Sequence, residues 1–258
     1  LIPALILEND PTTDDNVHAQ SRPLNERDPP MPVDRRTFLA GSVTALAASA
    51  LTTPSRAANE TPTPPTRRNR IGVSTYSFWH FKGEPVDIAH CIDRAAEMGF
   101  DGVEILHQQM GGEDNAYLQD LKRRAFTQGL DLMGFSTHQG FVSPDKAVRQ
   151  KNVDHTIKCI ELAYAMGIPT MRLNTGRWGT TRSFDQLMKD RGIEPRLEGY
   201  TDDQGFEWVI SSIEKCLKKA EQCGVTMGLE NHWGLGRTAE GVMRVVDAVK
   251  SPWLRVTM

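Results

Sequence analysis

The sequence predicts an α/β protein, a TIM (β/α)8 barrel that is incomplete here, with about five βα units and a sixth strand. With 258 residues, of which 39% are hydrophobic and 24% charged, the chain can form a sizeable core. One pattern, a helical segment that ends at a glycine before a short apolar run, recurs as "AAEMGFDGVEIL", "FTQGLDLMGFS", "AYAMGIPTMRLN" and "AEQCGVTMGLEN". Strands that alternate with helices in this way form a parallel sheet.

The glycines of this pattern mark the ends of helices, where a residue that tolerates the left-handed conformation is needed. They are Gly99, Gly129, Gly167 and Gly224. We expect strands at residues 71–75, 102–106, 132–137, 170–174, 225–230 and 254–258. No G-x-G-x-x-G or Walker loop follows these strands, which favours the barrel over a doubly wound nucleotide-binding sheet.

Helices are expected between the strands, among them residues 86–98 and 146–166. In the second of these, the spacing predicts that Val153, Ile157, Ile160 and Tyr164 form one apolar face. A polar insertion, residues 176–204, follows the fourth strand and is interpreted as a lid over the barrel mouth or a surface decoration.

The cysteines and the net charge exclude some classes of protein. Cys91, Cys159, Cys216 and Cys223 are too few and too scattered for a disulfide scaffold, and no C-x-x-C pair suggests a zinc ribbon. Cys216 and Cys223 are expected on one helix and are interpreted as small helix residues. The net charge of -3 gives no reason to expect nucleic-acid binding.

The first seventy residues are interpreted as a leader, an export signal and a linker that precede the folded domain. Residues 1–30 are a non-native or mis-started leader, residues 31–57 a signal peptide, residues 58–70 a Pro/Arg-rich linker and residues 71–258 the partial barrel. Arg35 and Arg36 precede a short apolar run, and Ser55-Arg56-Ala57 predicts cleavage after Ala57.

The paired arginines resemble a twin-arginine signal. This resemblance implies that the Tat export machinery is a partner and that the protein is exported, to a periplasmic or extracellular location. The alternatives are an ordinary secretory signal and a retained anchor.

Polar side chains gather where the predicted strands end, which is where TIM barrels carry out their chemistry. The candidates are Trp79 after the first strand, Glu104 on the second, His138 after the third, Asn174 at the fourth, and Glu230 and His232 at the fifth. Such a ring of Glu, His and Asn suits a divalent metal ion or the hydroxyl groups of a sugar. His107, just past the second strand, is interpreted as an ordinary loop residue.

Four phrases, "GVSTYSFW", "AAEMGFDGVEI", "AYAMGIPTMRLNTG" and "GVTMGLENHWG", resemble the sugar phosphate isomerase/epimerase family of xylose isomerase-like barrels. The resemblance implies one divalent metal ion, most often Mn2+, with Mg2+, Co2+ or Zn2+ as alternatives, held by Glu, Asp, His and Glu at the ends of strands five to eight. Glu230 occupies the first of these positions, and the other ligands are expected beyond Met258. The sequence is therefore interpreted as C-terminally truncated and inactive as it stands.

The predicted function is a metal-dependent isomerase or epimerase of a sugar, sugar phosphate or polyol, acting by proton transfer through an enediolate. Glu230 is the candidate metal ligand and catalytic residue. The candidate substrate-binding residues are Glu104, His138, Asn174, Trp79 and His232, with Trp233 as a further apolar wall. No nucleic-acid partner is expected, and a homo-oligomer is compatible with the sequence.

Other interpretations remain open. Glu104 could be only a buried ion-pair partner of Arg172, and Glu230 could form a structural ion pair. The competing functions are an inosose dehydratase-like lyase, an endonuclease IV-like metallonuclease and a non-catalytic exported carbohydrate-binding barrel. Asn174 stands where the nuclease branch would need a carboxylate, which argues against that class.

Overall fold

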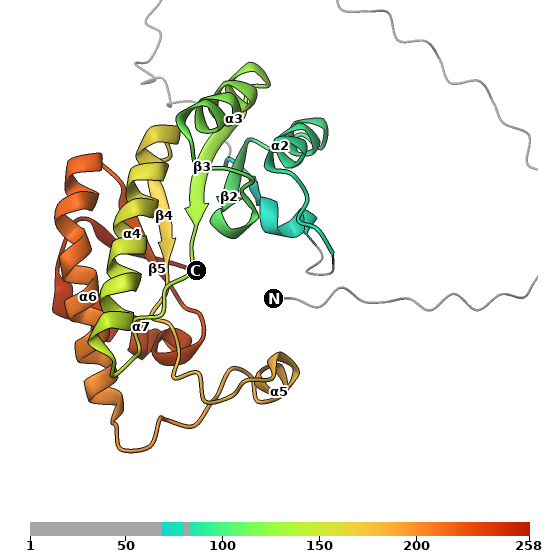
Figure 1. Cartoon of the computed structure of the whole chain (residues 1–258). Coiled ribbons are helices and arrows are strands. Elements are labelled where there is room, and N and C mark those ends of the chain that lie inside the picture. The colour runs from blue at the N-terminus through green and yellow to red at the C-terminus, as the bar shows by residue number, and fades with distance from the viewer. Residues whose placement is uncertain (1–68, 80–82) are drawn as a thin grey trace, which may run out of the picture. The chain divides into compact units, whose positions relative to one another are not determined.

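The computed structural model describes residues 69–79 and 83–258. The chain divides into two compact units, Leu1–Pro65 and Thr66–Met258, and the described residues belong to the second. Arg35, Arg36 and the cleavage position after Ala57 lie outside the described residues, as do the predicted leader and most of the predicted linker (Figure 1).

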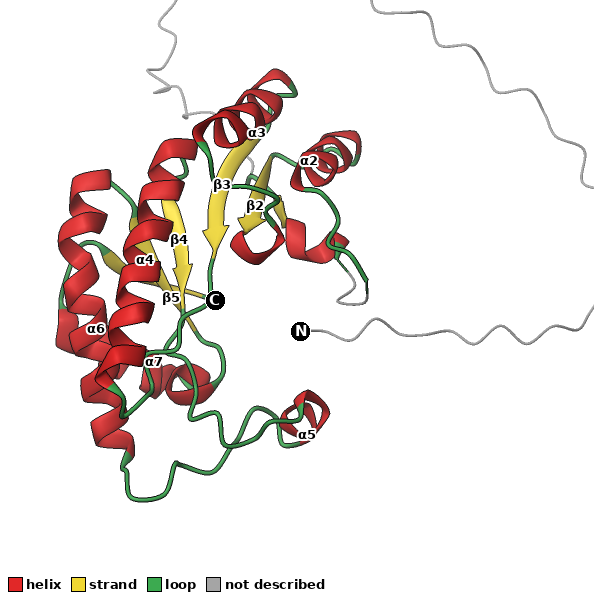
Figure 2. Cartoon of the chain, in the orientation of Figure 1, coloured by secondary structure: helices red, strands yellow, loops and turns green. Residues whose placement is uncertain are grey.

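The second unit is built on one sheet of six parallel strands, which neighbour one another in the order of the chain. The strands are β1 (Gly72–Ser74), β2 (Gly102–Leu106), β3 (Asp131–Ser136), β4 (Thr170–Leu173), β5 (Thr226–Glu230) and β6 (Leu254–Thr257). Sequential parallel order with helical crossovers is the topology of TIM-barrel βα units, so the predicted fold class is confirmed (Figure 2).

Helices connect the strands and cover the outer face of the sheet (Figure 2). The α-helices are α2 (Ile88–Glu97), α3 (Asn115–Thr127), α4 (Lys146–Met166), α5 (Phe184–Lys189), α6 (Asp202–Cys223) and α7 (Ala239–Val249). Short 3-10 turns follow three strands: η2 (Thr75–Phe78), η3 (His107–Gln109) and η4 (Gly234–Arg237). The four glycines expected after helices all have positive φ, between 65° and 79°.

The two faces of the sheet differ in character. Residues that alternate along the strands and face the helices are apolar and buried: Val103, Ile105, Phe135, Met171, Leu173, Met227 and Leu229. The opposite, inner face carries small and polar residues, and the strand register places Glu104 beside Gly134, and Arg172 beside both Ser136 and Gly228. Because successive side chains of a strand point to opposite faces, Glu230 shares the inner face with Gly228.

Helix α4 begins and ends where the sequence predicts, but its buried face differs from the predicted one. Val153 and Ile160 are buried, whereas Tyr164 is 63% exposed. The buried stripe instead includes Thr156, Cys159 and Ala163. The prediction for Tyr164 was wrong because small residues let this side of the helix approach the sheet and α6, while the long phenol points to solvent.

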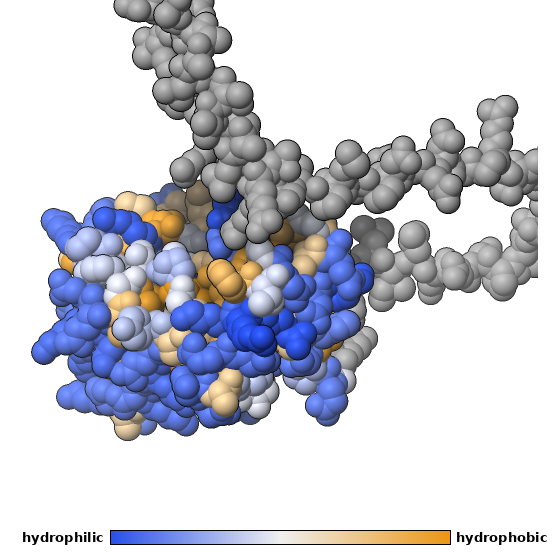
Figure 3. All heavy atoms as spheres, turned by 90° about the horizontal axis from the view of Figure 1, so that it is seen from above, coloured by the Kyte–Doolittle hydropathy of each residue, from blue (hydrophilic) through white to orange (hydrophobic). Residues whose placement is uncertain are grey.

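The end of the sheet at which the strands begin shows hydrophobic patches within a mostly hydrophilic surface (Figure 3). Exposed apolar side chains that precede or begin strands include Ile71, Met98, Phe126 and Met133, with 45–81% of their surface accessible. None of the helices in the described part of the chain is long and apolar enough to cross a membrane.

Candidate active site

An ion pair lies on the inner face of the sheet, near the carboxyl ends of the strands. Arg172 of β4 donates from Nη1 to Oε2 of Glu230 on β5 at 3.0 Å. The Arg172 side chain is 14% exposed and that of Glu230 is 24% exposed. The two residues meet because Arg172 pairs with Gly228, and Glu230 lies two residues further along the same face.

Burial and neighbouring charges act in opposite directions on Glu230. Burial raises the pKa of the Glu230 carboxyl, the Arg172 guanidinium lowers it, and the negative charge of Glu104 raises it again. The net direction is upward. A carboxylate whose pKa is raised is a better proton acceptor than an ordinary one while it stays ionised near neutral pH.

His138, just beyond β3, is held by the same arginine. Arg172 Nη2 lies 3.0 Å from His138 Nε2 and also donates to the backbone oxygen of Thr137 at 3.1 Å. A guanidinium only donates, so Nε2 accepts and the proton of the neutral ring sits on Nδ1. Burial, and next the charge of Arg172, lowers the pKa of His138 to about 4.

His232 lies beside Glu230, with Nε2 3.9 Å from Glu230 Oε2. Burial is the main cause that lowers the pKa of His232 to about 3, and Arg172 and His138 lower it further. Both histidines are therefore neutral at pH 7. A neutral imidazole can accept a proton, donate a hydrogen bond or bind a metal ion.

Two buried donors of this cluster have no hydrogen-bond partner among the described residues. They are Nδ1 of His138 and Nε of Arg172. A buried donor without an acceptor costs free energy, so native proteins rarely keep one unless a ligand or water completes it. Both atoms are buried in this structure, and a ligand oxygen or a water molecule that entered beside them would satisfy them.

Glu104 lies on the inner face of β2 and contributes negative charge to the cluster, because it raises the pKa of Glu230. The described ion pair of Arg172 is with Glu230, so the alternative in which Arg172 neutralises Glu104 was wrong. Gly134 leaves room for Glu104: a Cβ at that glycine would lie 3.2 Å from Glu104 Cγ. The glycine thus keeps the carboxylate side chain in place on the inner face.

Asn174 forms hydrogen bonds that hold two loops together. Its Oδ1 accepts from the backbone N–H of Gln139 at 3.1 Å, and its own backbone N–H donates to Gln139 Oε1 at 3.1 Å. Asn174 is 5% exposed. This reciprocal pair joins the loop after β3 to the loop after β4, and it leaves only the side-chain amide N–H groups of Asn174 for a substrate.

The tryptophans occupy different places around the strand ends. Trp79 is half-buried directly after η2. Trp233 packs against Phe184 of the insertion and against His232, with ring centroids 5.9 and 5.7 Å away. Trp178 packs edge-on against Trp208 at 6.0 Å. Trp233 therefore links the insertion to the neighbourhood of Glu230.

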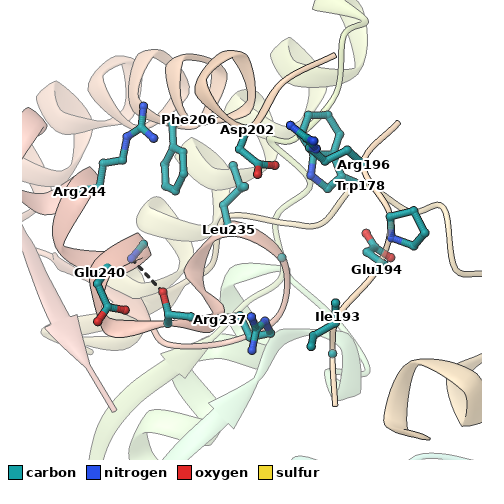
Figure 4. A pocket seen from close by; sticks show the side chains of 15 residues that line it. Trp178, Ile193, Glu194, Arg196, Asp202, Phe206, Leu235, Arg237, Glu240 and Arg244 are labelled. Atoms are coloured by element: carbon teal, nitrogen blue, oxygen red, sulfur yellow. Dashed lines mark hydrogen bonds between the residues drawn. The ribbon is translucent and has the colours of Figure 1, made fainter. Parts of the chain in front are cut away.

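The insertion after β4 also forms one wall of a cavity of about 680 Å³ (Figure 4). Its lining includes Trp178, Glu194, Arg196, Leu235 and Arg237. None of its lining residues belongs to the cluster around Glu230, so this cavity lies beside the candidate site. The insertion thus forms part of a cavity that is separate from the Glu230 cluster.

Metal-binding capacity in this cluster rests on Glu230. The carboxylate uses Oε2 for Arg172, and the adjacent neutral imidazoles of His138 and His232 are chemically suitable ligands. Over residues 69–79 and 83–258, however, the one group of three His, Cys, Asp or Glu ligand atoms close enough to share an ion lies elsewhere, at His107, His155 and Cys159. Within the described residues, Glu230 thus belongs to no group of three that could share an ion, and it fits only as a single ligand.

Together, the fold and the site define a class: an incomplete parallel βα barrel whose strand ends present a carboxylate, an arginine and neutral imidazoles. Residues 92–258 match the xylose isomerase-like TIM barrel family. The chain belongs to this family.

Solved structures of sugar epimerases share the fold. D-psicose 3-epimerase from Clostridium cellulolyticum H10, determined with D-tagatose, is 20% identical with a TM-score of 0.58, and the match covers 73% of this chain and 62% of the epimerase. The 3-keto-D-glucoside 4-epimerase of E. coli is 17% identical with a TM-score of 0.55, with 73% and 67% covered. The chain thus spans about two thirds of the length of these proteins.

A dehydratase also has this fold. The probable 3-DHS dehydratase of Bacillus anthracis is 16% identical with a TM-score of 0.52, and the match covers 73% of this chain and 62% of that enzyme. At these identities the likeness establishes the fold, and more than one type of reaction occurs on it.

Sequence reasoning missed two members of the cluster. Arg172 was considered only as a partner of Glu104, although an arginine at an inward position of a strand is itself a signal for a buried anion. Tyr76, on η2, is close enough for Arg172 and Glu230 to affect its pKa, which burial raises. The phenol adds a neutral hydroxyl group to the cluster.

Proposed function

We propose that the protein is a metal-dependent isomerase or epimerase of a sugar, sugar phosphate or polyol, acting by proton transfer through an enediolate. The observation that carries the proposal is the pair of unpartnered buried donors, His138 Nδ1 and Arg172 Nε, beside a carboxylate of raised pKa. Donors without acceptors suit a substrate rich in oxygen atoms, and a carboxylate of raised pKa suits proton abstraction.

Glu230 is the proposed proton acceptor and one metal ligand. Abstraction of the proton beside a carbonyl group leaves negative charge on the substrate oxygen atoms. Arg172 is already in place to stabilise this charge, because its guanidinium is largely buried and always protonated. The neutral His138 donates from Nδ1 to a substrate oxygen.

The proposed cofactor is a divalent ion, Mn2+ in the first instance. Such an ion, when bound, would acidify the C–H beside a carbonyl and stabilise the developing negative charge. Glu230 would hold it through one carboxylate oxygen. The remaining ligands are proposed to be the Asp, His and Glu that the family resemblance places beyond Met258.

The test uses the protein encoded by the complete gene, with Mn2+ and a panel of ketoses, keto-glycosides and inosose. We expect turnover that depends on the metal ion and falls by roughly 10²–10³-fold in Glu230→Gln, since the amide cannot accept the proton. Product analysis separates epimerisation from loss of water, which would assign the protein to the dehydratase alternative.

The matched control is Glu161→Gln, which removes a surface carboxylate paired with Lys219 at 2.6 Å on the outer helices. This variant should keep full activity and metal content. Equal activity of Glu230→Gln and the unmodified protein would refute the proposed role, as would the absence of both turnover and bound metal in the complete protein.

We also propose that the protein is exported by the twin-arginine route, on the basis of Arg35 and Arg36 ahead of the apolar run. Replacement of both arginines by lysine should retain the precursor in the cytoplasm while the chain remains folded. Export that continues unchanged would point instead to an ordinary secretory signal.

A further inference from the structure

Two histidines and a cysteine converge at a second place, between the end of β2 and helix α4. His107 begins η3, directly after β2, and His155 and Cys159 stand four residues apart on α4. This spacing places the two helix residues on the same face, one turn apart. Their ligand atoms and that of His107 all lie within 4.8 Å of one another.

Two of the three distances between ligand atoms are close to those of a tetrahedral zinc site. Cys159 Sγ lies 3.8 Å from His107 Nδ1 and 3.6 Å from His155 Nε2. With Zn–S of about 2.3 Å and Zn–N of about 2.0–2.1 Å, tetrahedral angles require S···N separations of about 3.6 Å. Both measured separations are already close to this value. The two imidazole nitrogens would need about 3.3 Å, so His155 has at most about 1.5 Å to close.

The ring of His107 is oriented by a carboxylate. Its Nε2 lies 2.7 Å from Glu113 Oε1, and Glu113 in turn pairs with Lys158. A hydrogen bond from Nε2–H to the carboxylate directs the lone pair of Nδ1 towards Cys159. Histidine ligands of metal ions usually donate their second N–H to such a carboxylate, which fixes the tautomer and increases ligand basicity.

The surroundings suit a soft divalent cation. The Cys159 side chain is fully buried, and that of His107 is 14% exposed. Burial, and next the proximity of His107, lowers the pKa of His155, so its ring is neutral. Burial raises the pKa of the Cys159 thiol to about 12, which keeps it protonated until a metal ion binds and displaces the proton.

We propose that His107 Nδ1, His155 Nε2 and Cys159 Sγ bind a zinc ion, with a water molecule as fourth ligand and Glu113 as the outer partner of His107. This site shares no residue with the cluster around Glu230. It includes a thiolate, which selects Zn2+ over the oxygen-preferring Mn2+ and Mg2+. The ion would tie the loop after β2 to helix α4, two segments about fifty residues apart in the chain.

Cobalt(II) is the probe that separates this site from the one proposed at Glu230. Co2+ bound to a cysteine thiolate gives a ligand-to-metal absorption band in the near ultraviolet, and the Glu230 cluster contains no cysteine. We expect the reduced, metal-free protein to show this band on addition of Co2+, to lose it when Zn2+ is added, and to lack it in Cys159→Ser.

Three further variants sharpen the experiment. Cys216→Ser is the matched control, because Cys216 is equally buried on the adjacent helix α6, but the hydrogen bonds of its Sγ go to the backbone oxygens of Val153 and Ser212. It should keep the band, as should Glu230→Gln. Glu113→Gln should keep the band but weaken Zn2+ binding by roughly 10–100-fold, as removal of an outer carboxylate partner does.

Two further measurements distinguish loss of the metal site from loss of folding. Circular dichroism and the thermal melt of each metal-free variant should match those of the unmodified protein, and Zn2+ should raise the Tm of the unmodified chain but not that of Cys159→Ser. His155→Gln is a second test of the same ligand set and should also lack the band. The proposal is overturned if Co2+ produces no thiolate band in the folded protein, or if the band survives in both Cys159→Ser and His155→Gln.

Discussion

Arg172 is the residue on which the candidate active site depends. It donates to Glu230, to the backbone of Thr137 and to His138, and so fixes the carboxylate and the imidazole relative to each other. Its own position follows from strand register, because β4 places it beside Gly228 and Ser136 on the inner face. An inward arginine in place of an aliphatic residue is costly for packing, and this cost is consistent with a functional role.

Replacing Arg172 with methionine tests this dependence. Arg172 lowers the pKa of Glu230, so Arg172→Met should raise that pKa further and move the acidic limb of kcat/KM to higher pH. We expect kcat/KM at its optimum to fall by about 10²-fold, since stabilisation of the developing negative charge is lost. The measurement is the pH profile of kcat/KM for Arg172→Met and the unmodified protein.

The control for that variant is Arg124→Met, which breaks a surface pair with Asp93 at 2.8 Å. This variant should leave the pH profile of kcat/KM unchanged. An unchanged acidic limb in Arg172→Met would show that the charge of Glu230 does not govern the reaction.

His138 should make the stability of the protein depend on pH. Its folded-state pKa of about 4 lies below the ordinary value of 6.5, so the unfolded chain binds more protons between these values. The contribution of neutral His138 is therefore complete above about pH 6.5 and is lost as the pH falls towards 4. At 1.36 kcal/mol per pH unit the loss is at most about 3 kcal/mol.

Urea unfolding at pH 7.5, 5.5 and 4.5 measures this contribution. His138→Gln should lose less stability over this range than the unmodified protein, because the glutamine has no proton to gain. His90→Gln, which replaces an exposed histidine on α2, should follow the unmodified curve. Identical curves for all three proteins would show that His138 is protonated as easily in the folded chain as in the unfolded one.

At the scale of elements, the loops after β4 and β5 press together backbone against backbone. Gly234, which begins η4, has φ of 69°, and a Cβ there would lie 2.1 Å from the carbonyl oxygen of Gly176. The hydroxyl group of Thr175 adds to the contact by accepting from the backbone N–H of Gly236 at 3.3 Å. Main-chain atoms cannot rotate away as a side chain does, so this approach requires glycine.

Gly234→Ala should therefore destabilise the protein by about 3 kcal/mol or more, through both the positive φ and the clash. The matched control is Gly99→Ala, because Gly99 has φ of 79° but nothing within 4 Å of the added Cβ. That change should cost about 1–2 kcal/mol, the penalty for the left-handed conformation alone. Equal losses of unfolding free energy would mean that the two loops can separate without cost.

The elements themselves could be predicted from sequence because their signals are local. A glycine after an amphipathic helix and an apolar run after the glycine define both boundaries, and each predicted strand limit lies within one residue of the observed one. The buried face of α4 was less predictable, since Tyr164 fits the helical spacing but the small residues Thr156 and Ala163 decide which side packs. That outcome depends on the neighbouring elements.

The site was predictable only in part. Glu230 was identified as a strand-end carboxylate, but its contact with Arg172 joins residues 58 positions apart through strand register, which no local pattern contains. His107 was interpreted as an ordinary loop residue and instead meets His155 and Cys159, because η3 turns it towards α4. A histidine and a cysteine four residues apart on one helix was the signal that could have indicated this cluster.

At the scale of the whole molecule, the described sheet has two strands with a single neighbour each. β1 pairs with β2 only, and β6 pairs with β5 only. Strands with unpaired backbone groups associate with other chains unless charge or covering segments prevent it. Val256 of β6 is 42% exposed and adds an apolar side chain to this edge.

The 258-residue chain should therefore associate as its concentration rises, and Val256→Lys should reduce this association, since charges on an edge strand oppose pairing. Light scattering across a concentration series measures the effect. Phe126→Lys is the matched control, because Phe126 is 81% exposed but lies on α3, away from β6. If this control reduces association as much as Val256→Lys, the hydrophobic patches at the strand starts are responsible instead.

The close approach of Gly234 and Gly176 also has an engineering consequence. The segment between Arg177 and Tyr200 follows this contact in the chain. It leads to the capping box of α6, in which Thr201 and Gln204 satisfy the first turn of the helix. Segments of other lengths could be grafted between these two fixed points if they keep an aromatic contact to Trp233 like that of Phe184. Exchange of this segment would change the surface beside the Glu230 cluster, while Glu230 and Arg172 stay on their strands.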